Sequence, residues 1–478
     1  MLHEMSFRLD EGVNLPSDTE IIFYDPGISG KSTRGCGGGC GSCGGNSDNG
    51  VTELIESRFL AVSPGVASYI SLDTELLDGF RGLLAGKTLR EVRDDLEARF
   101  GPNSAREKLQ LLLRNIVGRN FIAGAEAEEA LLKHPRMQIY VTNRCNLRCK
   151  HCYMSSGDAL PNEIGTPDRL RAIDLFADHC PGSKVTFTGG EALLNPDIFL
   201  LLAHARSRGL RTELYSNGLT IKDSGFAERI AKSIDEVQVS IDGASEYTND
   251  AIRGRGTFHK IIRGIKLLDQ ARHTSNTNFK YRLAITLTAL NMDDIRSNIQ
   301  TFVTSLGLHE RPEIRIGTVG KLGRAKENPD LVQDHDALQM AQAEIVNEFS
   351  HSGMHRMLIS KVNRFTKTCG MGLSITIGAD GAIYPCTITD QKPIGNIRDE
   401  DSEQKFLSVF SYSRQTDVDH VEGCRSCEIR YFCGGICRIT NFFKTGSMQV
   451  SACTPSYKNM QIRNLIARYD SYGLSSLN

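Results

Sequence analysis

The most informative part of the sequence is Cys145-Asn146-Leu147-Arg148-Cys149-Lys150-His151-Cys152-Tyr153, which carries three cysteines at C-x3-C-x2-C spacing. The apolar run before it, residues 137–142, predicts a buried strand, so the cysteines lie in a short loop at that strand's end. Such a loop can bind three irons of a [4Fe-4S] cluster, whereas four thiolates would saturate it. We therefore expect a cluster with one open iron. The alternatives are a zinc site without its fourth ligand and a loop of free thiols.

Length, charge and cysteine usage narrow the class of protein. The 478 residues suggest about three domains. The net charge of -1 gives no sign of nucleic acid or an anionic membrane as partner. No signal-peptide pattern opens the chain and no apolar run is long enough to span a membrane. We expect a cytoplasmic protein, in which fourteen cysteines serve metal ligation rather than disulfides.

The middle of the chain alternates strand and helix patterns. Expected helices between the strands include residues 166–179, 197–208 and 257–271. Expected strands are residues 137–142, 184–188, 211–215, 236–241, 281–288 and 313–317. Repeated βα units predict a parallel sheet. Six units are too few for a closed eight-stranded barrel, so we predict an α/β fold with a partial (β/α)6, TIM-like barrel.

Polar residues follow the predicted strands, where the functional residues of such barrels lie. The second strand runs into Gly189-Gly190-Glu191, the third into Ser216-Asn217-Gly218, and the fourth into Ser240-Ile241-Asp242. One Gly-Gly-Glu turn is a weak motif, and Ser or Asp often caps a strand end for structural reasons alone. Together with the three-cysteine loop, these strand ends form a strong constellation.

The stretch of about 185 residues that holds these motifs resembles the radical S-adenosylmethionine (radical SAM) superfamily. The resemblance implies that Cys145, Cys149 and Cys152 hold a reactive [4Fe-4S] cluster whose open iron binds S-adenosylmethionine. No side chain is expected to act as an acid or base. The implied contacts to this cofactor are His151 (through its backbone, at a usually aromatic position), Gly190, Glu191, Ser216, Asn217, Ser240, Asp242 and Arg253.

The C-terminal region contains seven further cysteines, at positions 369, 386, 424, 427, 433, 437 and 453. Its C-x2-C and C-x3-C pairs would also suit a zinc ribbon. Their full spacing is similar to the SPASM domain of peptide-modifying radical SAM enzymes, which holds two auxiliary [4Fe-4S] clusters. The resemblance implies one cluster on Cys424, Cys427, Cys433 and Cys453, and a second on Cys369, Cys386 and Cys437 with one iron open. The lack of a cysteine at 370–380 and Thr387 after Cys386 argue against sulfatase maturation.

The N-terminal region divides into two parts. Residues 1–50 end in a tract rich in Gly and Cys, which we expect to be flexible, so that Cys36, Cys40 and Cys43 have no assigned role. Residues 51–127 predict a winged-helix module with capping boxes at Thr88 and Ser104. The module resembles PqqD-type domains that grip the leader of a ribosomally made peptide. A winged helix for oligomer or DNA contact is the alternative.

The expected domains are thus 1–50, 51–127, a radical SAM barrel at 134–320, a helical connector at 321–365, a SPASM domain at 366–457 and a C-terminal helix or tail at 458–478. The resemblance implies a radical SAM/SPASM maturase of the kind that makes sactipeptide or ranthipeptide thioethers. It would bind a precursor peptide by its leader and take electrons from a flavodoxin or ferredoxin. Alternatives are another modification (a C–C cross-link, epimerisation or enzyme-subunit maturation) or a non-catalytic iron–sulfur scaffold.

Overall fold

The computed structural model describes residues 9–24, 58–129, 135–275, 277–332, 335–351, 364–389 and 391–471. Six parallel strands form its centre in the order β10-β9-β8-β7-β6-β5. They are β5 (Arg136–Tyr140), β6 (Lys184–Thr188), β7 (Arg211–Ser216), β8 (Glu236–Ser240), β9 (Lys280–Leu287) and β10 (Glu313–Thr318). This mostly parallel α/β sheet confirms the expected fold class, with strand ends within two residues of the predicted ones.

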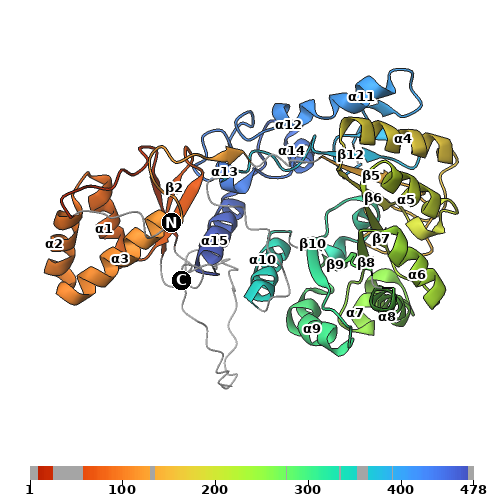
Figure 1. Cartoon of the computed structure of the whole chain (residues 1–478), viewed down its shortest axis with the longest axis horizontal. Coiled ribbons are helices and arrows are strands. Elements are labelled where there is room, and N and C mark those ends of the chain that lie inside the picture. Colours follow the sequence, from red (N-terminus) through yellow and green to blue (C-terminus); the bar gives the residue numbers. More distant parts are fainter. Residues whose placement is uncertain are drawn as a thin grey trace, which may run out of the picture.

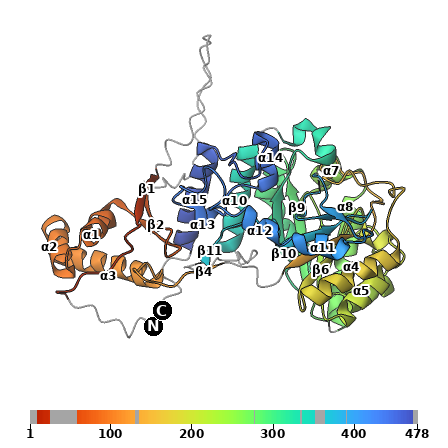
Figure 2. The same ribbon diagram turned by 90° about the horizontal axis from the view of Figure 1, so that it is seen from above.

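Helices cover the outer face of the curved sheet (Figures 1 and 2). They are α4 (Thr166–His179), α5 (Ile198–Ser207), α6 (Ser224–Ser233), α7 (Glu246–Arg253), α8 (Phe258–Thr274) and α9 (Met292–Ser305). The strand β6 shows the division of the two faces. Val185 and Phe187 belong to the main apolar core with Phe176 of α4, whereas the alternate residues, such as Thr186, are polar. The apolar face therefore binds the helices, and the inner face is polar.

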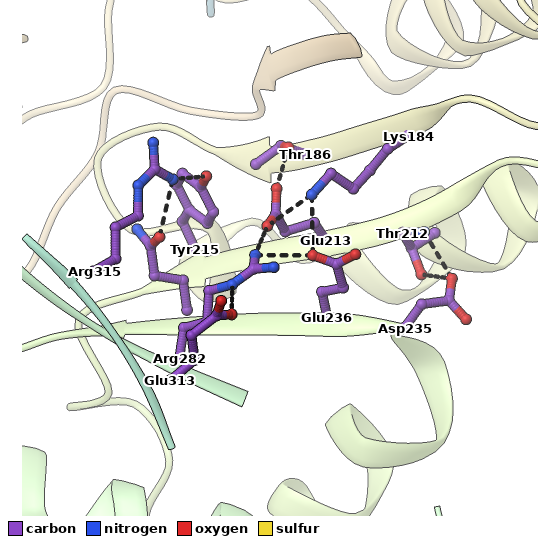
Figure 3. Close-up of polar contacts among 11 residues, drawn as sticks. Lys184, Thr186, Thr212, Glu213, Tyr215, Asp235, Glu236, Arg282, Glu313 and Arg315 are labelled. Carbon is purple, nitrogen blue, oxygen red and sulfur yellow. Dashed lines mark hydrogen bonds and ion pairs between the residues drawn. The ribbon is translucent and has the colours of Figure 1, made fainter. Parts of the chain in front are cut away.

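Charged side chains fill the inner face near the starts of the strands, as Figure 3 shows. Lys184 Nζ lies 3.1 Å from Glu213 Oε1 and 3.0 Å from Glu236 Oε2. Arg282 Nη1 lies 2.7 Å and 2.8 Å from the same two carboxylates, and its Nε lies 2.6 Å from Glu313. The network closes the end of the barrel opposite the cysteine loop, where buried residues serve stability rather than chemistry.

The sheet does not stop at the barrel. The strand β12 (Ser374–Ile377) pairs in parallel with β5, and β13 (Ala382–Tyr384) and β14 (Gly395–Asn396) continue it in antiparallel fashion. These strands come from the region expected to form a separate cysteine-rich domain. Since β5 leads into the first cysteine loop and β13 leads towards Cys386, one sheet positions both groups of cysteines.

The N-terminal module has a three-stranded antiparallel sheet, β1 (Glu20–Tyr24), β2 (Arg58–Ser63) and β3 (Ser68–Leu72), with helices α1 (Thr74–Leu84), α2 (Leu89–Phe100) and α3 (Pro102–Gly118). The capping box at Thr88 and Glu91 is present in both directions. The capping box expected at Ser104 was wrong, because α3 already begins at Pro102, whose missing N–H suits the first helical position.

The expectation of a flexible segment over residues 1–50 fails for residues 9–24, since β1 pairs with β2 and Val13 packs into the module's core. Cys36, Cys40 and Cys43 lie outside the described residues. The strand β1 could not be predicted, because a single edge strand of five residues has too little periodicity to stand out.

Two helices lie between this module and the barrel, α10 (His335–His351) and α15 (Pro455–Ser471), side by side in both views (Figures 1 and 2). Ile462, Leu465 and Ile466 of α15 share a core with β2 and with Ile429 of the cysteine-rich region. The remaining short elements are β4 (Glu128–Glu129), β11 (Arg364–Phe365), α11 (Ser402–Ser408), α12 (Ser411–Gln415), α13 (Arg430–Cys433), α14 (Arg438–Thr445) and the 3-10 helices η1 (Ala192–Leu194), η2 (Gly323–Lys326) and η3 (Pro329–Leu331). Within the described ranges, no helix is both long and apolar enough to cross a membrane.

Candidate functional site

The cysteine loop leaves β5 at the carboxyl end of the parallel strands. Its backbone is tied to its surroundings at several points. Cys145 N donates to Gly157 O over 2.8 Å, which closes the loop on itself, and Lys150 N donates to Ile252 O of α7 over 3.0 Å. These bonds matter because the loop has no regular secondary structure of its own. Its shape is set by the strand ends and by α7.

The Gly-Gly-Glu turn packs against the start of this loop. Gly190 N donates to Thr142 O over 2.8 Å. A Cβ on Gly189 would collide with the Thr142 carbonyl, and one on Gly190 would collide with the carbonyls of Asn143 and Arg144. Gly189 also has a φ of 139°, which side chains rarely adopt. The two glycines are therefore required by the close approach of two backbone segments. This approach places the turn against residues 142–144, just before Cys145.

Glu191 links this turn to the next strand end. Its carboxylate is 1% exposed and accepts from Ser216 Oγ (2.9 Å), Asn217 N (2.7 Å) and Leu193 N (3.1 Å). Burial raises the pKa of Glu191, and the three donors act in the opposite direction. The side chain holds the ends of β6 and β7 together. A contact from Glu191 to the amino group of a cofactor stays a prediction.

Asp242 forms the centre of a second buried polar group. Its Oδ2 lies 2.5 Å from His151 Nε2 and 2.7 Å from Arg253 Nε, and its Oδ1 accepts from Thr286 N over 2.8 Å. Burial would raise the pKa of Asp242, but the charge of Arg253 and the contact with His151 hold it well below its usual range. The group ties the cysteine loop, through the ring of His151, to β8 and α7. The imidazole therefore has a structural partner that an aromatic residue at this position would lack.

The other expected cofactor contacts lie at the same edge of the sheet. Asn217 Nδ2 donates to Asn146 Oδ1 over 2.7 Å and lies 3.9 Å from Cys145 Sγ. Ser216 is buried, and its hydroxyl donates to Glu191. Ser240 is half-buried, and its side chain makes no hydrogen bond within the described part of the chain. The structure thus brings all eight expected positions to one end of the barrel. Their contacts to a cofactor remain predictions.

Cys145, Cys149 and Cys152 all lie in this loop, and their binding of a cluster stays a prediction. No three Cys, His, Asp or Glu side chains of the described residues converge closely enough to hold one metal ion. A cluster needs thiolates around a larger body, each on its own iron. Burial raises the pKa of Cys145 to about 11, the Leu147 N–H lowers it, and the neighbouring Cys149 and Cys152 raise it. Loading a cluster would therefore have to displace protons from these thiols.

The pKa values of two C-terminal cysteines are affected by members of the two ligand sets that the resemblance implied, and both sets stay predictions. Burial raises the pKa of Cys433 to about 12, with further effects from Cys453, Cys424 and Cys427. In the other group, burial raises the pKa of Cys386 to about 11, and Cys369 and Cys437 raise it further.

Backbone N–H groups two residues ahead point at several of these sulfurs. Leu147 N lies 3.4 Å from Cys145 Sγ and Ile388 N lies 3.5 Å from Cys386 Sγ. N–H donors of this kind stabilise thiolates bound to iron. Cys180 differs, because burial alone raises its pKa to about 11. It is a small apolar residue of the main core.

One further contact to the cysteine loop was not predicted from the sequence. Arg324, in the segment expected to be a connector, donates from Nε to Cys149 O (2.9 Å) and from Nη1 to Ser156 O (2.8 Å). The adjoining Gly323 has a φ of 50°, and a Cβ there would collide with the Cys152 and Tyr153 carbonyls. The only cue in the sequence is this Gly-Arg pair a few residues after β10.

Comparison with known proteins finds a family match in the central part of the chain. Residues 139–296 match the Radical SAM superfamily. The sporulation killing factor maturation protein SkfB of Bacillus subtilis is 30% identical over 269 residues, 55% of this chain and 62% of SkfB. An AdoMet-dependent heme synthase of Oleidesulfovibrio alaskensis is 25% identical (64% of this chain, 83% of that protein). The mycofactocin maturase MftC of Mycolicibacterium smegmatis is also 25% identical (63% and 78%).

Two solved structures share the fold. The structure of anSMEcpe with bound AdoMet has a TM-score of 0.53 at 18% identity, and covers 70% of this chain and 98% of its own. Streptococcus suis SuiB bound to S-adenosylmethionine has a TM-score of 0.50 at 15% identity, and the match covers 83% of this chain and 96% of SuiB. The match to SkfB spans less than two thirds of that relative's length.

Proposed function

Since residues 139–296 match the Radical SAM superfamily, we propose that this chain is a radical SAM enzyme that modifies a ribosomally made peptide. The observation that carries the proposal is the cysteine loop itself. Three thiols stand at the carboxyl end of a parallel sheet, beside a Gly-Gly-Glu turn that packs on the loop's backbone. Cys145, Cys149 and Cys152 would hold the [4Fe-4S] cluster, with one iron left for S-adenosylmethionine.

Such a cluster, when reduced, supplies the electron that splits S-adenosylmethionine into methionine and a 5′-deoxyadenosyl radical. The chain's own residues would bind, orient and enclose S-adenosylmethionine. Glu191 and Asp242 are fully engaged by neighbouring donors, so their first task is to fix the strand ends. Asn217 and Ser240, which lie at the same edge, would contact the cofactor's polar groups. No side chain has to transfer a proton in this scheme.

The C-terminal cysteines would hold two auxiliary [4Fe-4S] clusters, one with four protein ligands and one with three. This division is supported by the neighbours that affect each pKa. The pKa of Cys433 is raised by Cys453, Cys424 and Cys427, and that of Cys386 by Cys369 and Cys437. One of these clusters, when bound, would supply an acceptor for the surplus electron. A flavodoxin or ferredoxin would supply the first electron, and a cytoplasmic location would keep the thiols reduced.

We infer that the substrate is a precursor peptide whose leader binds the N-terminal module. Relatives named as maturation proteins, SkfB and MftC, support a peptide substrate. The module's three-stranded sheet has β1 and β3 at its edges, and an extended peptide can add a strand to such an edge.

The proposed product is a thioether between a substrate cysteine and another residue. The experiment is anaerobic incubation of the reconstituted protein with reductant, S-adenosylmethionine and the precursor peptide encoded beside the gene, followed by mass spectrometry. A thioether removes two hydrogens and leaves one thiol fewer for alkylation. Loss of two hydrogens with the thiol intact would indicate a carbon–carbon cross-link, and an unchanged mass with an altered residue would indicate epimerisation.

A further inference from the structure

Arg324 contacts the cysteine loop more extensively than any role as part of a connector requires. Its Nε donates to Cys149 O over 2.9 Å, and its Nη1 donates to Ser156 O over 2.8 Å. Its backbone N–H donates to Cys152 O over 3.0 Å. Two of the three acceptors are carbonyl groups of cysteines expected to bind the reactive cluster. The three bonds span the second half of the loop, from Cys149 to Ser156.

This half of the loop needs support from outside. Its own backbone bonds are those of tight turns, Cys152 N to Cys149 O (3.2 Å) and Ser155 N to Cys152 O (3.1 Å). Ser155 has a φ of 50°, a conformation that costs a residue with a side chain some stability. Loss of the Arg324 side chain would also remove the donor to the Ser156 carbonyl, which adds to that cost. The contacts from Arg324 therefore hold a backbone shape that the loop would not keep alone.

The loop is held on two sides. On one side, Ile252 of α7 accepts from Lys150 and Asp242 contacts the His151 ring. On the other side lies the turn that follows β10, where only glycine fits at position 323 because its backbone rests on the Cys152 and Tyr153 carbonyls. Arg324 extends this second side by two side-chain hydrogen bonds. Removing this side chain would leave the second side of the loop held only by the backbone of residues 323 and 324.

The charge of Arg324 is also unusual in its surroundings. Within the described ranges it has no carboxylate in ion-pair contact, in contrast to Arg282, which has three. Its cation lies against the cysteine loop, because Nε donates to the Cys149 carbonyl. A cation near the sulfurs of a cluster makes the reduced, more negative state easier to form.

We propose that Arg324 is a positioning residue for the reactive cluster: it fixes the carbonyls of Cys149 and Cys152, and its charge offsets that of the thiolates. The inference rests on the proposed function, because it assumes a cluster on this loop. It assigns to the segment after β10 a part in the site that sequence comparison over residues 139–296 does not reach.

The test compares the full chain, reconstituted with iron and sulfide, as wild type, Arg324→Gln, Arg324→Lys and Arg296→Gln. Arg296 pairs with Glu344 over 3.2 Å at the surface between α9 and α10, so its variant controls for loss of an arginine near this region. The readouts are the change that S-adenosylmethionine causes in the EPR spectrum of the reduced protein, the midpoint potential of that signal, and the rate at which a chelator removes it.

In Arg324→Gln we expect chelator loss about tenfold faster than in wild type, which is the usual effect of losing an outer support of a metal ligand. We also expect a more negative midpoint potential. Arg324→Lys should restore the potential but only part of the resistance to chelator, because an ammonium keeps the charge and cannot make both side-chain bonds. Arg296→Gln should match wild type.

The proposal is overturned if Arg324→Gln keeps the wild-type potential and chelator rate. It is also overturned if Arg296→Gln loses the signal as fast as Arg324→Gln does. If Arg324→Gln does not fold, Arg324→Lys decides, and wild-type behaviour of that variant in the chelator assay contradicts the positioning role. Failure of the proposed function looks different: wild type itself would show no EPR change with S-adenosylmethionine.

Discussion

The phenol oxygens of Tyr140 and Tyr153 lie 2.6 Å apart, and the Tyr140 hydroxyl also reaches Thr387 O over 3.3 Å. Tyr140 ends β5, Tyr153 follows Cys152, and Thr387 follows Cys386. One buried hydroxyl therefore joins the first cysteine loop to the loop of an auxiliary cysteine. This contact, together with the pairing of β12 with β5, makes the two groups of cysteines parts of one structural unit.

Tyr140→Phe removes this shared hydroxyl and nothing else. We expect the free energy of unfolding to fall by about 1–3 kcal/mol, because Gln138 and Tyr153 lose a buried partner. Urea unfolding measures the change. Tyr247→Phe, at a side chain that is 86% exposed, is the control and should leave the midpoint unchanged. Equal midpoints for wild type and Tyr140→Phe would show that the hydroxyl bridge contributes nothing.

Gly190→Ala should disrupt the cysteine loop, because a Cβ at this position meets the Asn143 and Arg144 carbonyls at distances that real structures do not tolerate. The backbone before Cys145 would have to move. The expected result is a folded protein that binds less iron on reconstitution. Gly225→Ala in α6 is the matched control, since its Cβ would meet only Asp223 at 3.5 Å. Normal iron binding by Gly190→Ala would contradict the account of this turn.

The charged network at the closed end of the barrel predicts a pH dependence. Burial would raise the pKa of Glu236, but Lys184 and Arg282 lower it to about 2 from an ordinary value of 4.5. A carboxyl whose pKa is lowered on folding contributes stability above its unfolded value and loses it as pH falls towards the folded value. The contribution of Glu236 is therefore complete above about pH 5 and disappears between pH 4.5 and 2.

Glu236→Gln measures this contribution directly. At pH 7 the variant should be less stable by on the order of 3 kcal/mol, since it leaves Lys184 and Arg282 with fewer carboxylates. The difference from wild type should shrink as the pH falls below 4.5. Denaturant unfolding of both proteins at several pH values gives the curve. A difference that stays constant from pH 7 to pH 3 would rule out the ionised Glu236 as its source.

Cysteine variants separate ligands from core residues. Cys433→Ala should lower the iron content of the reconstituted protein by up to one [4Fe-4S] cluster, about four irons per chain. Cys180→Ala should keep the full iron content, because Cys180 packs among apolar residues of the barrel core. Iron and sulfide analysis of both variants gives the comparison. Iron loss in Cys180→Ala of the same size would mean that the measured loss reports unfolding rather than ligation.

The barrel could be predicted from the sequence because each of its strands carries a strong local pattern. In β6, for example, Val185 and Phe187 alternate with polar residues, and polar strand ends such as Asn217 and Asp242 follow at matching places. Parallel strands bring their carboxyl ends to one edge, so the neighbourhood of the site follows from the strand assignments alone. The Thr88 capping box was likewise a local pattern and was found.

What could not be predicted depends on contacts between distant segments. The strand β12 has four residues, too few for a recognisable period, and its place beside β5 is set by tertiary pairing. Arg324 meets Cys149 across 175 residues, and no property of either sequence segment specifies that contact. The engagement of Glu191 and Asp242 by neighbouring donors was missed for the same reason, since their motifs suggested cofactor contacts first.

The central claim is that the Cys145–Cys149–Cys152 loop supports reductive cleavage of S-adenosylmethionine. The most direct measurement is anaerobic incubation of the reconstituted protein with dithionite and S-adenosylmethionine, with and without precursor peptide, and quantification of 5′-deoxyadenosine. Wild type should form 5′-deoxyadenosine, and Cys152→Ala, prepared in the same way, should form none above background. Absence of 5′-deoxyadenosine from wild type under both conditions would contradict the account.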